Sequence, residues 1–146
     1  MQLKIQKVRE GAILPVRATD GSAGMDLHAW LEQPLTVEAG QQVRVPTGIA
    51  IGLPHKETVA LLFPRSGLAV KHGITLSNCV GVIDSDYTGE IQVGIINQSG
   101  TAYTIQPGER IAQMVIMPVL LPQLELVDSL EETARGAGGF GSTGRT

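Results

Sequence analysis

Apolar and polar residues alternate along most of this chain, with a period of two. Short alternating runs rich in Val, Ile and Leu are typical of β-strands that bury one face. The clearest runs, mostly separated by Gly, Pro, Asn or Asp, are QQVRVPTGIAIGLP, TVALLFP, EIQVGIINQ, YTIQPGERIAQMVIMPVL and QLELVDSL. In the third run, Ile91, Val93 and Ile95 share one face. Many short strands with almost no helix predict an all-β sandwich, jelly roll or barrel.

One segment departs from this period. RSGLAVKHG follows Pro64, and its spacing predicts a short helix with Leu68 and Val70 facing inward. Gly73 is placed to end the helix, since glycine readily adopts the left-handed conformation of a C-cap. We therefore expect one short helix in an otherwise β-structured domain.

The character of the sequence changes after about Leu130. EETARGAGGFGSTGRT has no periodicity and is rich in glycine, so we expect a β domain over residues 1–130 and a flexible arm over 131–146. A disordered tail is one interpretation. The other is a functional arm, because Phe140 between glycines has no use in a linker, and Arg135, Ser142 and Thr143 supply anion-binding groups.

Composition narrows the classes of partner. A chain of 146 residues is one ordinary domain, and its net charge of −3 disfavours nucleic acid or an anionic membrane as the main partner. The single cysteine, Cys79, cannot form an internal disulfide, which favours a reducing compartment. No apolar run reaches the ~20 residues of a membrane span, and the N-terminus lacks a secretory pattern. We expect a soluble, cytoplasmic protein.

The stretch GVIDSDYTGE carries a dense set of acids. Asp84, Asp86 and Thr88 stand at alternate positions before Gly89, as at the start of a calcium loop. Such a loop needs a bidentate glutamate at its twelfth position and flanking helices, but that position is Ile95 and the flanks are strand-like. A calcium loop is excluded, so the acids need another role.

Three further stretches carry candidate chemistry, each with two interpretations. In SAGMDLHA, Asp26 lies among apolar neighbours and either caps a turn or serves a site. In FPRSGLA, Arg65 and Ser66 open the expected helix, either as an ordinary cap or as a phosphate cradle. In PGERIAQ, Gln113 falls on the apolar face with Ile111, Val115 and Met117, and its amide needs a core hydrogen bond or a ligand.

Several common sites do not fit. GAGGFGST lacks the lysine and the strand–loop–helix context of a nucleotide-binding P-loop, although a glycine arm can still wrap phosphate with its N–H groups. His28, His55 and His72 show no metal-ligand spacing, and no nucleophile elbow is present. Any enzyme here must use carboxylate and arginine chemistry.

In chain order, five stretches resemble the five motifs of the trimeric dUTPase family: AGMDLHA, PRSGLA, NCVGVIDSDYTGE, GERIAQ and RGAGGFGSTG. The resemblance implies a jelly-roll subunit that assembles as a homotrimer, with three sites at subunit interfaces and an arm that closes over a neighbouring site. It also implies hydrolysis of dUTP to dUMP and pyrophosphate, which limits uracil incorporation into DNA and supplies dUMP for thymidylate synthesis.

The resemblance and elementary chemistry together suggest roles at the phosphates. Asp84 is the expected base that activates water for attack on the α-phosphorus. Mg²⁺ is expected as cofactor, held mainly by substrate phosphates and water rather than by protein ligands, with Asp26 supporting a metal-bound water. The residues expected to hold the phosphate chain are Arg65, Ser66, Gly67 and Gln113.

Other residues are expected around the nucleoside. The hairpin backbone, including Val82, Ile83 and Gln92, would read the uracil edge, with Asn78 adding an amide. Tyr87 would lie against the deoxyribose and Phe140 would stack on the base. The arm groups expected at the γ-phosphate are Arg135, Gly141, Ser142 and Thr143, whereas Asp86 and Glu90 are expected only to serve the turn and surface.

Two rival functions stay open. A dCTP deaminase shares this fold but carries a longer Arg–Ser–Ser motif and a Trp or Phe where Tyr87 stands, so PRSGLA and DYTGE favour the pyrophosphatase. A non-catalytic jelly-roll module, such as a capsid or sugar-binding domain, would have no use for the Gly-Phe-Gly tail.

Overall fold

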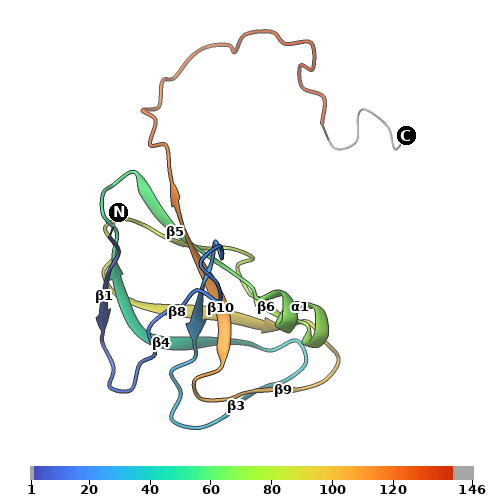
Figure 1. Cartoon of the computed structure of the whole chain (residues 1–146). Coiled ribbons are helices and arrows are strands. Elements are labelled where there is room, and N and C mark those ends of the chain that lie inside the picture. The colour runs from blue at the N-terminus through green and yellow to red at the C-terminus, as the bar shows by residue number, and fades with distance from the viewer. Residues whose placement is uncertain (1, 140–146) are drawn as a thin grey trace.

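The structure is a computed structural model that describes residues 2–139. It confirms the predicted all-β class with a single short helix in that range (Figure 1). The strands are β1 (Lys4–Lys7), β2 (Met25–His28), β3 (Leu35–Val37), β4 (Gln42–Gly52), β5 (Thr58–Phe63), β6 (Ile74–Leu76), β7 (Gly81–Ile83), β8 (Glu90–Asn97), β9 (Tyr103–Ile105) and β10 (Arg110–Pro118), and the helix is α1 (Ser66–His72).

The strands form two four-stranded sheets and a separate pair. One sheet has the order β1-β4-β8-β6, the other β2-β10-β5-β7, and β3 pairs with β9. All of these pairings are antiparallel. Neighbours in both sheets come from distant parts of the chain, as expected of a jelly-roll-like sandwich.

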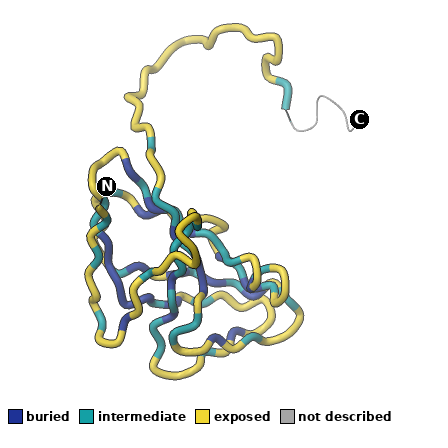
Figure 2. The backbone as a smooth tube through the Cα atoms, viewed as in Figure 1, coloured by how far each residue is buried: buried dark blue, intermediate teal, exposed yellow. Residues whose placement is uncertain are grey.

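The buried faces of both sheets form a single core of aliphatic side chains. Figure 2 shows where the buried residues lie along the backbone. The predicted inward face of β8 is confirmed, since Ile91, Val93 and Ile95 are all buried. Among aromatic residues, Trp30 and Tyr103 pack only at the edge of this core. The strand pattern therefore specifies the core without any fully buried aromatic ring in the described range.

The helix forms where the sequence predicts it. Gly73 adopts the left-handed conformation at its C-cap (φ 67°), as expected, and Leu68 is buried. The predicted inward position of Val70 is wrong, because its side chain is 85% exposed. Seven residues make only two turns, so the helix buries a single side chain and presents the rest to solvent.

Strand β10 also corrects one prediction. Its register shifts at a bulge between Arg110 and Ala112, so that Ala112 and Met114 face the core. Gln113 consequently lies on the less buried face, not the inward face that the alternation predicted. A bulge inserts one residue into a strand and thereby reverses the side chains that follow it, which a pattern of alternate residues does not reveal.

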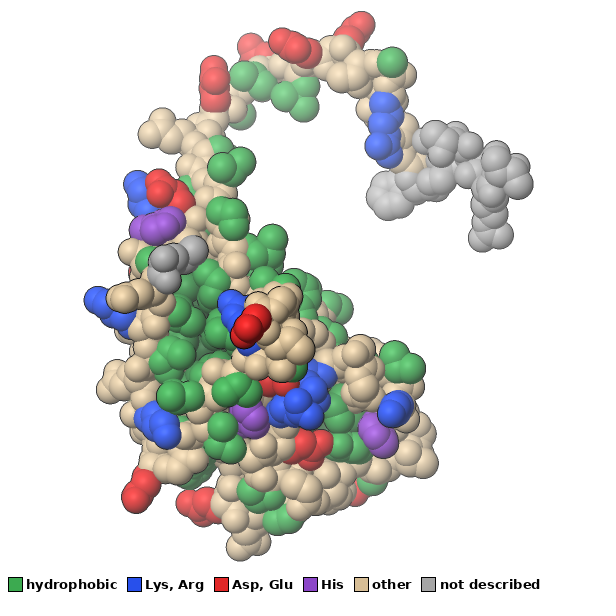
Figure 3. All heavy atoms as spheres, in the orientation of Figure 1, with side chains coloured by type: hydrophobic (Ala, Val, Ile, Leu, Met, Phe, Trp, Pro, Cys, Tyr) green, Lys and Arg blue, Asp and Glu red, His purple; other side chains and the backbone are tan. Residues whose placement is uncertain are grey.

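Beyond Pro118 the described chain runs away from the sandwich and makes no strand (Figure 1). The predicted strand QLELVDSL is thus absent, because its backbone has no neighbouring strand within this chain to pair with. Apolar and acidic side chains of this segment project into solvent (Figure 3), with Leu124 at 98% and Leu126 at 100% exposure. As for membrane insertion, the described part of the chain offers no helix with the length and hydrophobicity to cross a bilayer.

Candidate active site

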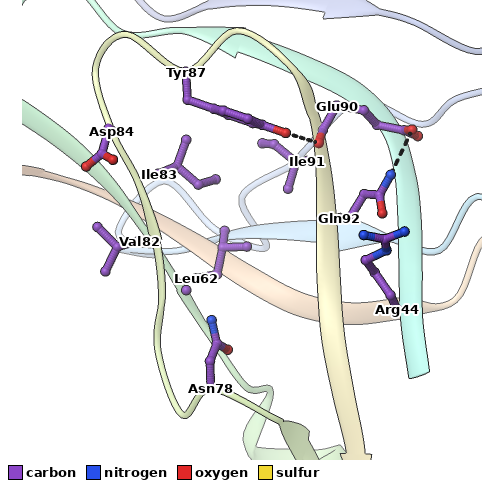
Figure 4. Close-up of a pocket in the computed structure, with 11 residues that line it drawn as sticks. Arg44, Leu62, Asn78, Val82, Ile83, Asp84, Tyr87, Glu90, Ile91 and Gln92 are labelled. Carbon is purple, nitrogen blue, oxygen red and sulfur yellow. Dashed lines mark hydrogen bonds between the residues drawn. The ribbon is translucent and has the colours of Figure 1, made fainter. Parts of the chain in front are cut away.

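A cavity of about 350 Å³ lies between β7 and β8 (Figure 4). The predicted pairing of these strands as a β-hairpin is wrong, because β7 pairs with β5 and β8 with β4 and β6, in different sheets. We keep the name hairpin for the β7–turn–β8 segment and call the cavity the hairpin pocket. Strand β5 closes one wall and β4 contributes Arg44 to another. The hairpin pocket collects six of the residues expected at the base, sugar and α-phosphate, and its lining is Arg44, Leu62, Asn78, Gly81, Val82, Ile83, Asp84, Tyr87, Glu90, Ile91 and Gln92.

The turn of this hairpin is fixed by Tyr87. Its hydroxyl donates a hydrogen bond to the backbone carbonyl of Glu90 at 2.9 Å, and its backbone N–H donates to the carbonyl of Asp84 at 3.1 Å. The ring crosses Gly89 so closely that a Cβ there would lie 2.6 Å from the phenolic oxygen. Glycine at position 89 therefore lets the tyrosine lie flat across the turn, with one face open to the pocket.

Asp84 occupies the end of the pocket opposite Asn78 (Figure 4). Its side chain is exposed. Within residues 2–139 the Asp84 carboxylate takes part in no side-chain hydrogen bond or ion pair. An ionised carboxylate with free lone pairs, held at the start of a hydrogen-bonded turn, can orient a water molecule and accept its proton.

Glu90 corrects another expectation. It was expected to serve only the surface, yet its side chain is only 15% exposed and forms a two-pronged ion pair with Arg9. The N–H of Gly48 donates a further bond to the same carboxylate at 2.9 Å. Hydrogen bonding from Arg9 holds the pKa of Glu90 below its ordinary value of 4.5, so the group stays ionised at neutral pH.

A second cavity, of about 370 Å³, lies between β2, β10 and the start of α1, and we call it the arginine pocket. The Asp26 carboxylate there receives two arginines, Arg65 Nε at 2.9 Å and Arg110 Nη1 at 3.1 Å. Asp26 is largely shielded from solvent and Arg110 is half-exposed. The pocket is lined by Ala18, Ser22, Ala23, Gly24, Asp26, Arg65, Ser66, Gly67 and Gln113.

Gln113 belongs to the arginine pocket because of its place in the sheet. It lies opposite Asp26 on β2 and Phe63 on β5, so three strands bring these positions into one row. The Gln113 amide N–H donates to the carbonyl of Pro64 at 3.0 Å. A Cβ on Gly24 would lie 2.5 Å from Gln113 Oε1, so glycine at that position leaves room for the amide.

The two pockets lie at opposite ends of the β5–β7 pair. Ile83 pairs with Ala60, so Asp84 extends past Ala60 toward the start of β5, whereas Arg65 follows the other end of β5. The two backbone positions are thus about six residues apart along the sheet, on the order of 20 Å. A triphosphate chain is shorter than this separation.

The arm residues take no part in either pocket in the described range. Arg135 lies on the exposed segment, where its Nε donates to the carbonyl of Gly138 at 2.9 Å. The expected roles of Phe140, Gly141, Ser142 and Thr143 lie outside the described residues.

Sequence reasoning missed three arginines. Arg44 lines the hairpin pocket, Arg110 binds Asp26 and Arg9 binds Glu90. Arg110 could have been found, since it stands inside the GERIAQ stretch, three residues before Gln113. Arg9 and Arg44 have no local motif, and only the pairing of distant strands brings them to the hairpin.

The described residues contain no cluster of three or more His, Cys, Asp or Glu side chains that could enclose a metal ion. Asp26 can still accept a hydrogen bond from a metal-bound water, because each carboxylate oxygen has a lone pair beyond the one used by an arginine.

Comparison with known proteins bears on the family to which the chain belongs. The pattern of the dUTPase family matches residues 10–144. The chain is 54% identical over 146 residues to a deoxyuridine 5'-triphosphate nucleotidohydrolase of Desulfitobacterium hafniense, covering 99% of this chain and 97% of the relative. It is 56% identical over 131 residues to one of Hahella chejuensis, covering 90% and 86%.

Among solved structures, the dUTPase of Staphylococcus bacteriophage 80alpha with dUpNHpp superposes with a TM-score of 0.89 at 27% identity, covering 99% of both chains. Fold and relatives first define the class, an all-β hydrolase. Within that class, the chain belongs to the dUTPase family.

Proposed function

We propose that this chain hydrolyses dUTP to dUMP and pyrophosphate. The observation that carries the proposal is the hairpin pocket, where the carboxylate of Asp84, unpaired among residues 2–139, stands at one end of a cavity lined by backbone, Asn78 and Tyr87. The relatives named for this reaction match almost the whole chain, and the phage enzyme of the same fold holds a dUTP analogue.

In the proposed reaction, Asp84 orients a water molecule and takes one of its protons as the water oxygen bonds to the α-phosphorus. The bond from the α-phosphorus to the bridging oxygen breaks, and pyrophosphate leaves with that bond's electron pair. The exposure of Asp84 supports this role, because no neighbouring cation in the described chain competes for its lone pairs.

Uracil would bind along the hairpin. The backbone groups of Val82 and Ile83 and the Asn78 amide can match its donor and acceptor edge, while cytosine would leave buried groups unpaired. Tyr87 would lie against the deoxyribose, so that a ribose 2′-hydroxyl clashes with the ring. The fixed position of this ring across Gly89 supports that assignment.

The arginine pocket would bind the phosphate chain through Arg65, Ser66, Gly67 and Gln113, all of which line it. Mg²⁺ would neutralise the triphosphate's charge when bound, with phosphates and water as its main ligands. Asp26 holds Arg65 and Arg110 in place and would accept a hydrogen bond from a water of that ion.

We further propose a homotrimer whose sites combine the hairpin pocket of one copy with the arginine pocket of another. The separation of Asp84 and Arg65 within one chain supports this arrangement. So does the exposed apolar segment after Pro118, since such side chains in water favour association. The arm over residues 131–146 would then close over the site of a neighbouring copy. The proposed location of the enzyme is the cytoplasm.

The reaction is tested by measuring pyrophosphate and ammonia release from each deoxynucleoside triphosphate, with and without Mg²⁺. We expect Mg²⁺-dependent pyrophosphate release from dUTP alone. Ammonia release from dCTP would support a deaminase instead, and absence of both products would support a binding module.

The shared site has its own test. Chains carrying Asp84→Asn and chains carrying Arg65→Gln should each be inactive. After the two are unfolded, mixed and refolded together, some sites regain both wild-type residues from different copies, and activity should reappear. If mixing restores nothing although mixed oligomers form, each site is built from one copy.

A further inference from the structure

The Glu90 carboxylate is bonded by three different parts of the chain. Arg9 Nε and Nη2 donate to its two oxygens at 2.7 and 2.9 Å. The Gly48 N–H donates at 2.9 Å, and the Gln92 amide lies at 3.5 Å. Such a set exceeds what an exposed turn residue needs. Of the three donors only Gln92 lines the hairpin pocket (Figure 4), whereas Arg9 belongs to the N-terminal segment and Gly48 to β4.

A bulge in β4 provides the seat for this carboxylate. Pro46 pairs with Gln92 and Ala50 with Glu90, so three residues of β4 lie opposite one residue of β8. Gly48 at the centre of the bulge has φ of 72° and is packed so closely that a Cβ would lie 2.7 Å from the side chain of Ala12. The bulge turns the Gly48 N–H toward Glu90 instead of toward a ladder partner.

Arg9 is itself held in place. Its guanidinium lies 4.5 Å from the ring centroid of Trp30, and the Trp30 indole N–H donates to the carbonyl of Glu10 at 2.7 Å. The Val8 N–H donates to the carbonyl of Gly48 at 2.8 Å, so the N-terminal segment is tied to the same bulge. Stacking and a two-pronged ion pair together restrict the arginine to one orientation.

This network reaches the hairpin pocket through one residue. The Glu90 side chain receives Arg9, while its backbone carbonyl accepts the hydroxyl of Tyr87. Any shift of Glu90 would therefore move the acceptor that holds the tyrosine ring across Gly89. Arg9 does not line the pocket, whereas Glu90, its partner, does.

We propose that Arg9 and Glu90 are positioning residues for sugar selection: their ion pair fixes the height of the Tyr87 ring and thereby sets how strongly the enzyme rejects ribonucleotides. This inference rests on the proposed function. A displaced ring would open space beside C2′ and lose contact with the deoxyribose. The kcat/KM for UTP would therefore rise and the kcat/KM for dUTP would fall.

The test measures kcat and KM for dUTP and UTP in Glu90→Gln and Arg9→Met. Glutamine keeps the size of the side chain but removes its charge, and methionine keeps the apolar contact with Trp30 but removes the guanidinium. We expect the ratio of kcat/KM for dUTP to that for UTP to fall about tenfold in each, as loss of one charge-assisted hydrogen bond implies. Arg9→Lys, which keeps the charge but not the fork, should retain an intermediate ratio.

A matched control is Tyr103→Phe, which removes a different side-chain hydrogen bond to a carboxylate, that of Glu109, outside the hairpin pocket. This variant should leave the dUTP-to-UTP ratio unchanged even where it lowers thermal stability. A ratio that falls in the Arg9 and Glu90 variants but not in the control supports the inference.

A ratio that is unchanged in both Arg9→Met and Glu90→Gln overturns it, and so does an equal fall in the control, which would indicate a general loss of stability. Failure of the proposed function is distinct, because the wild-type protein would then not hydrolyse dUTP at all.

Discussion

Two aspartates, one in each pocket, stand in opposite chemical situations. Asp84 on the hairpin is exposed, and in the described range its carboxylate has no partner. Asp26 in the arginine pocket is 13% exposed and neutralised by two arginines. Both oxygens of Asp26 are already engaged by arginines, whereas the lone pairs of Asp84 are open to a water molecule. The difference favours the proposed base role for Asp84 and a positioning role for Asp26.

The surroundings of the two residues follow the same division. The hairpin around Asp84 is fixed by contacts behind it, from Tyr87 to Glu90 and on to Arg9, so the acid itself need not form any. In the arginine pocket the acid is the fixing element, since Arg65 at the N-cap of α1 and Arg110 at the start of β10 both bind Asp26. Removing either acid should therefore damage different properties.

The largest effect is expected for Asp84→Asn. Asparagine cannot accept the water's proton, so kcat for dUTP should fall about 10³-fold, within the range of general-base removal. The free energy of unfolding should stay within about 0.5 kcal/mol of wild type, because Asp84 is exposed and has no side-chain partner within residues 2–139. Normal turnover in this variant would show that another group is the base.

The second-largest effect on activity is expected for deletion of the chain after Ala134. The sandwich ends at Pro118, so the truncated protein should fold and assemble normally. Without the arm, Arg135 and the residues after it can no longer cover the substrate, and kcat should fall about 10²-fold, as for the loss of transition-state donors. The check is steady-state kinetics alongside sedimentation; full activity in the truncated protein would contradict a closing arm.

Asp26→Asn should lower stability more and activity less than Asp84→Asn does. Two arginines lose their common partner, so the free energy of unfolding should fall by about 2 kcal/mol. Activity should fall only about tenfold, because the arginines remain near the phosphates. Urea unfolding measures the first quantity. If Asp26→Asn were as stable as wild type but as inactive as Asp84→Asn, the division between the two acids would be wrong.

The smallest effect concerns pH. Because the pKa of Glu90 is lower in the folded chain than its ordinary value of 4.5, its ion pair stabilises the fold above that value and the contribution is lost as pH falls through the lowered pKa. The difference in Tm between wild type and Glu90→Gln should therefore be largest near neutral pH. It should shrink as the pH is lowered and Glu90 becomes protonated. A Tm difference that does not change with pH would mean that Glu90 stabilises the fold without its charge.

The alternation of side chains was sufficient to predict the sandwich, because an antiparallel sheet with one buried face imposes its period on the sequence. It was also sufficient to predict the burial of Ile91, Val93 and Ile95. It placed Gln113 on the wrong face, since the bulge in β10 leaves no mark in the pattern. The apolar run after Pro118 was taken for a strand because local preference says nothing about whether a partner strand is present.

For the candidate site too, the sequence indicates local groupings of residues but not contacts between distant segments. The motif residues of the hairpin lie together because they are neighbours in sequence, so a local stretch could indicate them. Arg9 and Glu90 are 81 positions apart, and no local feature predicts that they meet. Long-range ion pairs of this kind depend on strand order and register, which the sequence pattern leaves open.

The central claim is that one substrate lies across a hairpin pocket and an arginine pocket that belong to different copies of the chain. A crystal structure of the assembled protein with a non-hydrolysable dUTP analogue and Mg²⁺ tests it most directly. We expect uracil against the hairpin backbone of one copy, Asp84 of that copy facing a water in line with the α-phosphorus, and phosphates on Arg65 and Gln113 of another copy. A base bound away from the hairpin, or a triphosphate held by one copy alone, would contradict the account.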